Sequence, residues 1–229
     1  MRKLTIVILM SLGLITSASA DLGVKIGFSG QVGEFDAKGS ETNRTTSTTE
    51  TSDTREMLYG NISIFIEKDL KFIPVPIINR LSFGFEKDQN PSMSMGSVTN
   101  QRVQQLSGAN VKATRTNQAS ADISDFDQTY VLFNVTDWLY LKSGTTSLSV
   151  KTTESLETTG SYPNVELDGT MWGFGVHNQR DNGIFFRVEA NYYDIDGVTV
   201  NNSNADSVMQ VKLDGINGAT AKASIGKAF

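Results

Sequence analysis

Apolar residues alternate with polar residues or glycine in six segments of this chain, and no other feature constrains its fold as strongly. Successive side chains of a β-strand point to opposite faces, so each segment predicts a strand with one apolar and one polar or glycine-rich face. No stretch of comparable length has helical spacing. The chain is therefore predicted to be all-β. The six segments are residues 22–29, 58–67, 81–86, 128–135, 169–176 and 184–193.

The first twenty residues predict a secretory signal peptide. Met1–Lys3 is cationic, Leu4–Ile15 is almost wholly apolar, and Ala18–Ala20 fits a small-residue cleavage site. The apolar run is too short for a membrane-spanning helix, which needs roughly twenty residues. We predict cleavage after Ala20 and one domain over residues 21–229.

Long and short connections alternate between the expected strands. Polar segments of unusual length occupy residues 36–55, 87–125, 152–164 and 197–206, whereas residues 136–137 and 179–183 are tight turns. Eight strands joined by alternating long and short connections predict an antiparallel up-and-down barrel with short turns at one end and long loops at the other. The strand expected to begin near Trp138 is irregular. Its apolar residues Leu139 and Leu141 fall on one face, whereas Leu148 and Val150 fall on the other. A bulge or register change is predicted there.

The last strand adds an aromatic C-terminus to this pattern. In residues 219–229, Ile225, Lys227 and the terminal Phe229 fall on one face. With the signal peptide and the eight-strand alternation, the chain resembles the small outer-membrane β-barrel family of the OmpX and opacity-protein type. The resemblance implies an eight-stranded transmembrane barrel in a Gram-negative outer membrane, with periplasmic turns and extracellular loops. It also implies that Ile225 and Phe229 belong to a signal read by the barrel-assembly machinery.

Aromatic residues near the expected strand ends predict an interfacial girdle. Trp138, Tyr140 and Tyr192 are the candidates, since barrels of this class carry aromatic rings at both membrane surfaces.

Charged residues fall on the face opposite the apolar one, which predicts a charged lumen. An eight-stranded barrel is just filled by side chains, and isolated buried charges cost several kcal/mol. We therefore expect these residues to form a salt-bridged, partly hydrated plug. The candidates are Lys25, Glu67, Glu86, Lys142, Arg187, Glu189 and Lys222.

Composition excludes several kinds of chemistry. The chain has no Cys, one His and a net charge of −5, so thiolate zinc sites, cysteine nucleophiles and multi-histidine sites are excluded. An acidic pI near 5.0 argues against nucleic-acid binding. The single His177 falls at the short-turn end, away from the outer rim. We expect no enzyme activity, no cofactor and no metal.

The sequence favours a non-enzymatic outer-membrane barrel with a structural or surface-interaction role. Its expected partners are outer-membrane lipids, including lipopolysaccharide, and it is expected to be a monomer. Two alternatives remain open at this point. A small pore for ions or polar solutes would use the charged lumen, and a soluble periplasmic β-sandwich or lipocalin-like binder would pack the apolar faces inward.

Overall fold

The computed structural model describes residues 23–43, 48–89, 93–105, 112–156, 161–203 and 209–229. The predicted signal peptide, residues 1–20, lies outside these ranges. No helix within them is long and apolar enough to cross a membrane. One 3-10 turn, η1 (Ile78–Arg80), lies between β2 and β3 in the described part of the chain. The strands are β1 (Val24–Asn43), β2 (Thr48–Asp69), β3 (Leu81–Gln89), β4 (Met93–Gln105), β5 (Lys112–Asn134), β6 (Leu139–Leu156), β7 (Val165–Gln179), β8 (Ile184–Asn201) and β9 (Met209–Ala228).

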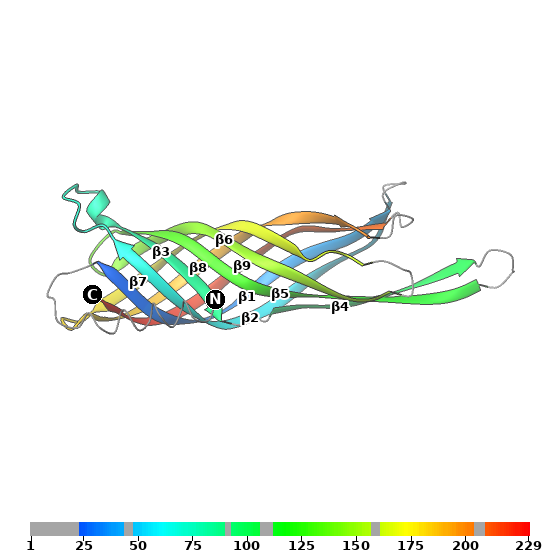
Figure 1. Cartoon of the computed structure of the whole chain (residues 1–229), viewed down its shortest axis with the longest axis horizontal. Helices are drawn as coiled ribbons and strands as arrows, with labels where there is room; N and C mark the ends of the chain where they lie inside the picture. Colours follow the sequence, from blue (N-terminus) through cyan, green and yellow to red (C-terminus); the bar gives the residue numbers. More distant parts are fainter. Residues whose placement is uncertain (1–22, 44–47, 90–92, 106–111, 157–160, 204–208) are drawn as a thin grey trace.

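These strands close into a barrel. They pair in the order β3-β2-β1-β9-β8-β7-β6-β5, and β3 also pairs with β5, which completes the ring. β4 pairs with β5 beyond the part that β3 occupies, so β3 and β4 share one position of the ring. The barrel thus has eight antiparallel positions, and the predicted fold class is confirmed. Figure 1 shows the short connections and the C-terminus at one end, and the β4–β5 hairpin as the longest projection at the other.

The strands are staggered, so a row of paired residues followed from strand to strand around the barrel rises along the barrel axis. A row of partners that starts at Lys68 on β2 passes through Trp172 on β7 and returns to β2 at Leu58. The row therefore rises ten residues in eight steps, which is the stagger of a closed sheet whose strands tilt by about 35–45°. Heights on different strands can be compared only after allowing for this rise.

The apolar side chains change sides part-way along the strands. Near the short turns most of them face outward, and Val32, Phe174 and Val188 are 65%, 53% and 59% exposed. Toward the opposite end they face inward, and Phe35 on β1 and Ile195 on β8 are each only 1% exposed. An outward apolar band suits lipid, whereas an inward apolar core suits a barrel surrounded by water.

The long polar segments are largely strand, which corrects the expectation of long loops. β1 and β2 extend over residues 36–43 and 48–55, and β3, β4 and β5 cover most of residues 87–125. Threonine explains part of this difference, because β-branched side chains favour extended backbone. The strands below also provide a template on which each hairpin can continue.

The register between β5 and β6 does shift opposite Leu148, but the bulge lies on β5 and not on β6, the strand for which it was predicted. β6 pairs with β7 from Leu139 to Val150 without a register shift. Leu141 is half exposed and Leu148 is buried because the surroundings of the strand change, and not its register. The irregularity lies on β5 between Ser124 and Asp127, where Asp125 has a φ of 55°.

Candidate functional site: the lumenal charge network

The structure places all seven candidate charged residues in the lumen. Each is between 1% and 6% exposed. They come from six strands, because alternate residues of every strand face the barrel axis. These residues are Lys25 on β1, Glu67 on β2, Glu86 on β3, Lys142 on β6, Arg187 and Glu189 on β8, and Lys222 on β9.

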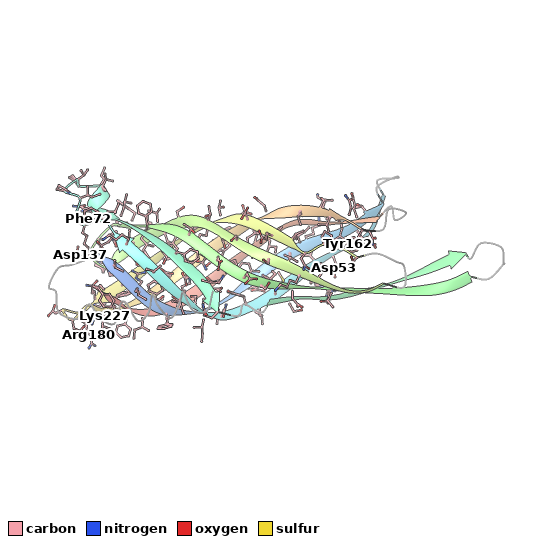
Figure 2. The ribbon with its side chains drawn as sticks, in the orientation of Figure 1. Asp53, Phe72, Asp137, Tyr162, Arg180 and Lys227 are labelled. Carbon is pink, nitrogen blue, oxygen red and sulfur yellow. The ribbon has the colours of Figure 1, made fainter. Side chains whose placement is uncertain are left out.

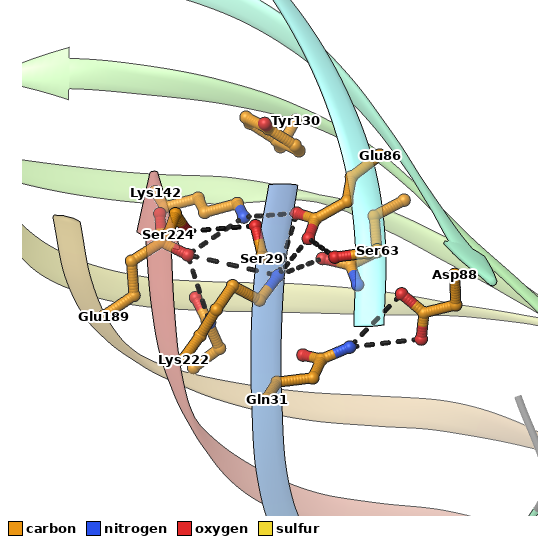
Figure 3. A network of polar contacts seen from close by, with 12 residues as sticks. Ser29, Gln31, Ser63, Glu86, Asp88, Tyr130, Lys142, Glu189, Lys222 and Ser224 are labelled. Atoms are coloured by element: carbon orange, nitrogen blue, oxygen red, sulfur yellow. Dashed lines mark hydrogen bonds and ion pairs between the residues drawn. The ribbon is translucent and has the colours of Figure 1, made fainter. Parts of the chain in front are cut away.

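Glu86 is the centre of the larger cluster (Figure 3). Lys222 Nζ lies 2.8 Å from both carboxylate oxygens of Glu86, and Lys142 Nζ lies 3.4 Å from Glu86 Oε2. Lys142 also lies 3.4 Å from Glu189 Oε2. Ser63 Oγ donates a further hydrogen bond to Glu86. Two lysines and two glutamates therefore neutralise one another across the barrel.

A second cluster lies nearer the short turns. Arg187 pairs with Glu67 through both terminal nitrogens, with Nη2 2.5 Å from Oε2. Tyr130 donates its hydroxyl to Glu67 Oε1 at 2.9 Å. The guanidinium carbon of Arg187 lies 4.6 Å from the centre of the Phe185 ring, a cation–π distance. Bidentate pairing of this kind fixes orientation as well as charge.

Lys25 does not join Lys222, although both strands meet at the barrel closure. Lys25 is paired with Ala228, whereas Lys222 is paired with Gln31, six residues farther along β1. Lys25 instead forms an ion pair with Asp69, 3.8 Å away.

Sequence reasoning missed several polar partners in the lumen. Each lies an even number of residues from a predicted lumenal charge on its own strand, so parity could have found them. They are Gln31, Tyr59, Ser63, Asp69 and Asp88.

Asp88 differs from the other lumenal acids in its partners. It accepts hydrogen bonds from Gln31 Nε2, at 3.1 Å, and from the Tyr59 hydroxyl. Among the residues that the structure describes, no lysine or arginine forms an ion pair with it. Its environment is therefore that of a hydrogen-bonded polar group and not of a paired charge.

An apolar core closes the lumen above the charges. Phe35, Tyr59, Phe126 and Tyr193 pack ring against ring, with centroids 5.4 to 6.3 Å apart. The surrounding members of this core are Met57, Ile123, Leu148, Val150, Leu167, Met171, Ile195, Leu213 and Ile216. The lumen is thus filled at two levels, by paired charges below and by packed apolar side chains above.

The three candidates for the interfacial aromatic girdle do not all face outward in the structure. Trp138 and Tyr192 face outward, with 58% and 36% of their surface exposed. The prediction that Tyr140 belongs to the girdle is wrong. Its side chain is fully buried in the lumen, where it donates a hydrogen bond to Glu189 and stacks on His177. An even spacing from Lys142 on β6 points its ring inward. Trp172, which the sequence analysis did not single out, lies outside against Tyr192 with ring centroids 5.5 Å apart.

The terminal strand closes against the first strand. Ile225 faces outward, and the backbone N–H of Phe229 donates to Val24 O at 2.9 Å. The recognition of these two residues during assembly remains a prediction.

The outer surface of the upper barrel is polar. Asp214 pairs with Lys212 at 2.7 Å and with Lys38 at 3.8 Å. The hydrogen bond from Lys212 holds the pKa of Asp214 below its usual range. Among the described residues, no group of three histidines or carboxylates could hold a metal ion.

No protein-family model and no curated protein matches the sequence. Solved structures do resemble the barrel. The outer membrane protein OprG from Pseudomonas aeruginosa matches with a TM-score of 0.50 and 10% identity, over 91% of this chain and 98% of OprG. The chain has the fold of an outer-membrane β-barrel. The outer membrane protease OmpT from Escherichia coli matches with a TM-score of 0.46 and 6% identity, over 94% and 99% of the two chains. The attachment invasion locus protein Ail of Yersinia pestis matches with a TM-score of 0.34 and 12% identity, over 86% of this chain and 97% of Ail.

Proposed function

We propose that this protein is an integral outer-membrane β-barrel of a Gram-negative bacterium that acts as a closed, rigid surface anchor. The observation that carries this proposal is the lumen, which buried ion pairs fill at one level and an apolar core fills at the next. A predicted signal peptide supports export, and the outward apolar band supports a lipid environment.

The extension beyond the apolar band supports a surface role. There the strands carry polar side chains outside and an apolar core inside, and the β4–β5 arm continues farther still (Figure 1). A barrel built this way holds its outer end at a fixed height and orientation. We infer that this end meets surface partners, with lipopolysaccharide among them, and that the barrel-assembly machinery inserts the chain as a monomer.

Burial of the lumenal groups supports a non-enzymatic role. The hydroxyl of Ser63 touches Glu86, but both residues are almost fully buried and Glu86 is already paired with two lysines. His177 is half buried at the short-turn end against Tyr140. Ser63 and Glu86 are enclosed by the paired charges and the packed core, and the ring of Tyr140 covers one face of His177.

The same packing argues against the two alternatives. A pore needs a continuous hydrated path, and the charge clusters and the apolar core block the axis. A soluble sandwich would bury its apolar faces, whereas Phe28, Ile62 and Phe186 lie on the outside of the barrel.

Cysteine labelling of intact cells tests this orientation, because the chain contains no cysteine of its own. A membrane-impermeant maleimide should label Asp53→Cys, in the exposed upper part of β2, without permeabilisation. It should label Asp181→Cys, in the β7–β8 turn, only after the outer membrane is opened. The reverse pattern would refute the proposed orientation. In planar bilayers the purified protein should be silent, and a steady ion-conducting state would favour the pore instead.

A further inference from the structure

An apolar surface projects from the short-turn end of the barrel. In residues 70–80, which we call the foot, Phe72 and Ile77 are 68% and 69% exposed and Val75 is 44% exposed. The neighbouring β5–β6 connection adds Trp138 and Val135, with 58% and 36% exposed. Figure 2 shows Phe72 at this end, on a segment that stands away from the barrel wall. Exposed apolar side chains gathered in this way mark a contact surface.

The two connections are fastened together. Arg80 Nη1 donates to Val135 O at 2.9 Å, and Asn134 Nδ2 donates to Arg80 O at 3.0 Å. The apolar residues of both connections therefore belong to one surface with a fixed shape.

The backbone of the foot satisfies much of its own hydrogen bonding. The N–H groups of Ile73, Val75, Asn79 and Arg80 donate to carbonyl oxygens within the foot at 2.8 to 3.2 Å. Pro74 and Pro76 carry no N–H at all. Irregular backbone is costly in lipid because unpaired polar groups lose water there. This internal pairing lowers that cost.

Cations border the foot where lipid headgroups would lie. Lys68 Nζ lies 5.1 Å from the centre of the Phe72 ring, and the side chain of Lys71 is 54% exposed. Cationic side chains beside apolar anchors are typical of a lipid interface, since their stems lie along apolar surface while their heads reach phosphates. The β7–β8 turn at the same end offers a contrast, because Arg180, Asp181 and Asn182 are exposed and none is apolar.

The apolar band reaches different heights on opposite sides of the barrel. Thr145 on β6 is three steps along a hydrogen-bonded row from Asn217 on β9, so Asn217 lies about four residues higher. Ala221, four residues nearer the short turns on β9, is therefore level with Thr145. At this height the β9 side is still apolar, with Val32 nearby on β1.

On the β3–β5–β6 side the outer surface is already polar at that height. Thr129 and Thr145 face outward, and Lys87 Nζ pairs with Asp127 Oδ1 at 2.8 Å. A charged group near the middle of a bilayer costs about 2–4 kcal/mol in a barrel. The foot and Trp138 lie below this same side. The apolar band is therefore displaced toward the short turns beneath β3, β5 and β6.

We propose that the barrel sits obliquely in its membrane, with the foot inserted into the lipid leaflet on the short-turn side. This inference rests on the proposed membrane location and adds the lipid contact that sets the orientation. Inserting the foot lowers the apolar boundary on the β3–β5–β6 side and brings Lys87 and Asp127 to the opposite headgroup region. The foot is continuous with the apolar band through Trp138, Leu139 and Leu141.

Depth-dependent quenching tests this arrangement. Single-cysteine variants of the full mature chain, labelled with an NBD fluorophore, are placed in phosphatidylcholine vesicles that contain lipids with a nitroxide on the acyl chain. Ile77→Cys should be quenched about as strongly as Ile225→Cys in the band, and at least about twofold more than Asp181→Cys. Ala221→Cys should be quenched more than Thr145→Cys. A heat-dependent gel shift confirms that each variant is folded.

The outcomes separate the two proposals. If Ile225→Cys is not quenched, the membrane location itself fails. If Ile225→Cys is quenched but Ile77→Cys behaves like Asp181→Cys, the foot lies in water and only this inference fails. Equal quenching of Ala221→Cys and Thr145→Cys would show an upright barrel.

Discussion

At the scale of single residues, buried carboxylates in the same lumen have very different surroundings. Glu86 lies between Lys142 and Lys222, and each of its oxygens is engaged. Asp88, two residues along the same strand, accepts hydrogen bonds from the neutral donors of Gln31 and Tyr59, and no described lysine or arginine forms an ion pair with it. Both acids are almost fully buried, so their energetic roles depend on their partners and not on exposure.

This difference predicts losses of unequal size for the two neutralising substitutions. Glu86→Gln leaves two buried lysines with only Glu189 between them and should lower the free energy of unfolding by about 3–5 kcal/mol. Asp88→Asn keeps a polar group of the same shape among neutral donors and should cost less than about 1 kcal/mol. Urea unfolding of the vesicle-embedded protein, followed by tryptophan fluorescence, measures both. Equal losses for the two variants would refute the assignment of Glu86 as the centre of the network.

At the scale of elements, each long strand passes through two environments. On β6, Leu141 faces outward and is 50% exposed, whereas Leu148 faces inward and is 1% exposed. On β7, Phe174 faces outward in the apolar band and Glu166 faces outward above it. On β6 and β7 the period of two is kept without a break, so the surroundings and not the strand decide which face is apolar.

The upper core predicts a contrast within β6. Leu148→Ala removes a buried side chain from packed rings and aliphatic groups and should cost about 2–5 kcal/mol in unfolding free energy. Leu141→Ala, on the lipid-facing side of the same strand, should cost distinctly less. The same urea titration measures the pair. If Leu141→Ala proved the more damaging, the inward apolar core would have to be abandoned.

The apolar band predicts a contrast within β7. Phe174→Arg places a charge against lipid and should lower stability by about 2–4 kcal/mol. Glu166→Arg changes an outward residue above the band and should be nearly neutral. Refolding yield into vesicles, read from the gel shift, gives an independent measure. If Phe174→Arg refolded as well as the unchanged protein, the outer face of β7 at this position would lie in water and not in lipid.

The sequence alone predicted the barrel because alternation marks six of its segments and long connections alternate with short ones, and it predicted the lumenal charges because parity assigns each residue to a face. It failed where alternation cannot report the surroundings. The change of apolar face between Leu141 and Leu148 was assigned to a bulge in that strand itself, because the chain alone does not show where lipid gives way to water, and the bulge is on the neighbouring β5. Tyr140 looked like an interfacial ring because its place near a strand end outweighed its even spacing from Lys142. Ion-pair partners such as Asp69 depend on the stagger of the closed ring, which no single strand reveals.

At the scale of the whole molecule, the two halves of the one barrel have opposite arrangements of polar and apolar side chains. The lower part has a polar, charge-paired interior and an apolar exterior, and the upper part has an apolar interior and a polar exterior. Strands of up to 23 residues run through both, so the outer end is held rigidly by the part in the membrane. A surface anchor requires this continuity, and a pore would require an open axis.

The central claim is that the mature chain is a closed barrel embedded in the outer membrane. Fractionation of cells, followed by a carbonate wash and an SDS gel of unboiled and boiled samples, tests it most directly. The account predicts that the protein stays with the outer-membrane pellet and migrates differently before and after boiling, because a closed barrel resists SDS until heated. Release into the soluble fraction with no heat-dependent shift would contradict it and would mean that the outward apolar side chains are buried in some other way.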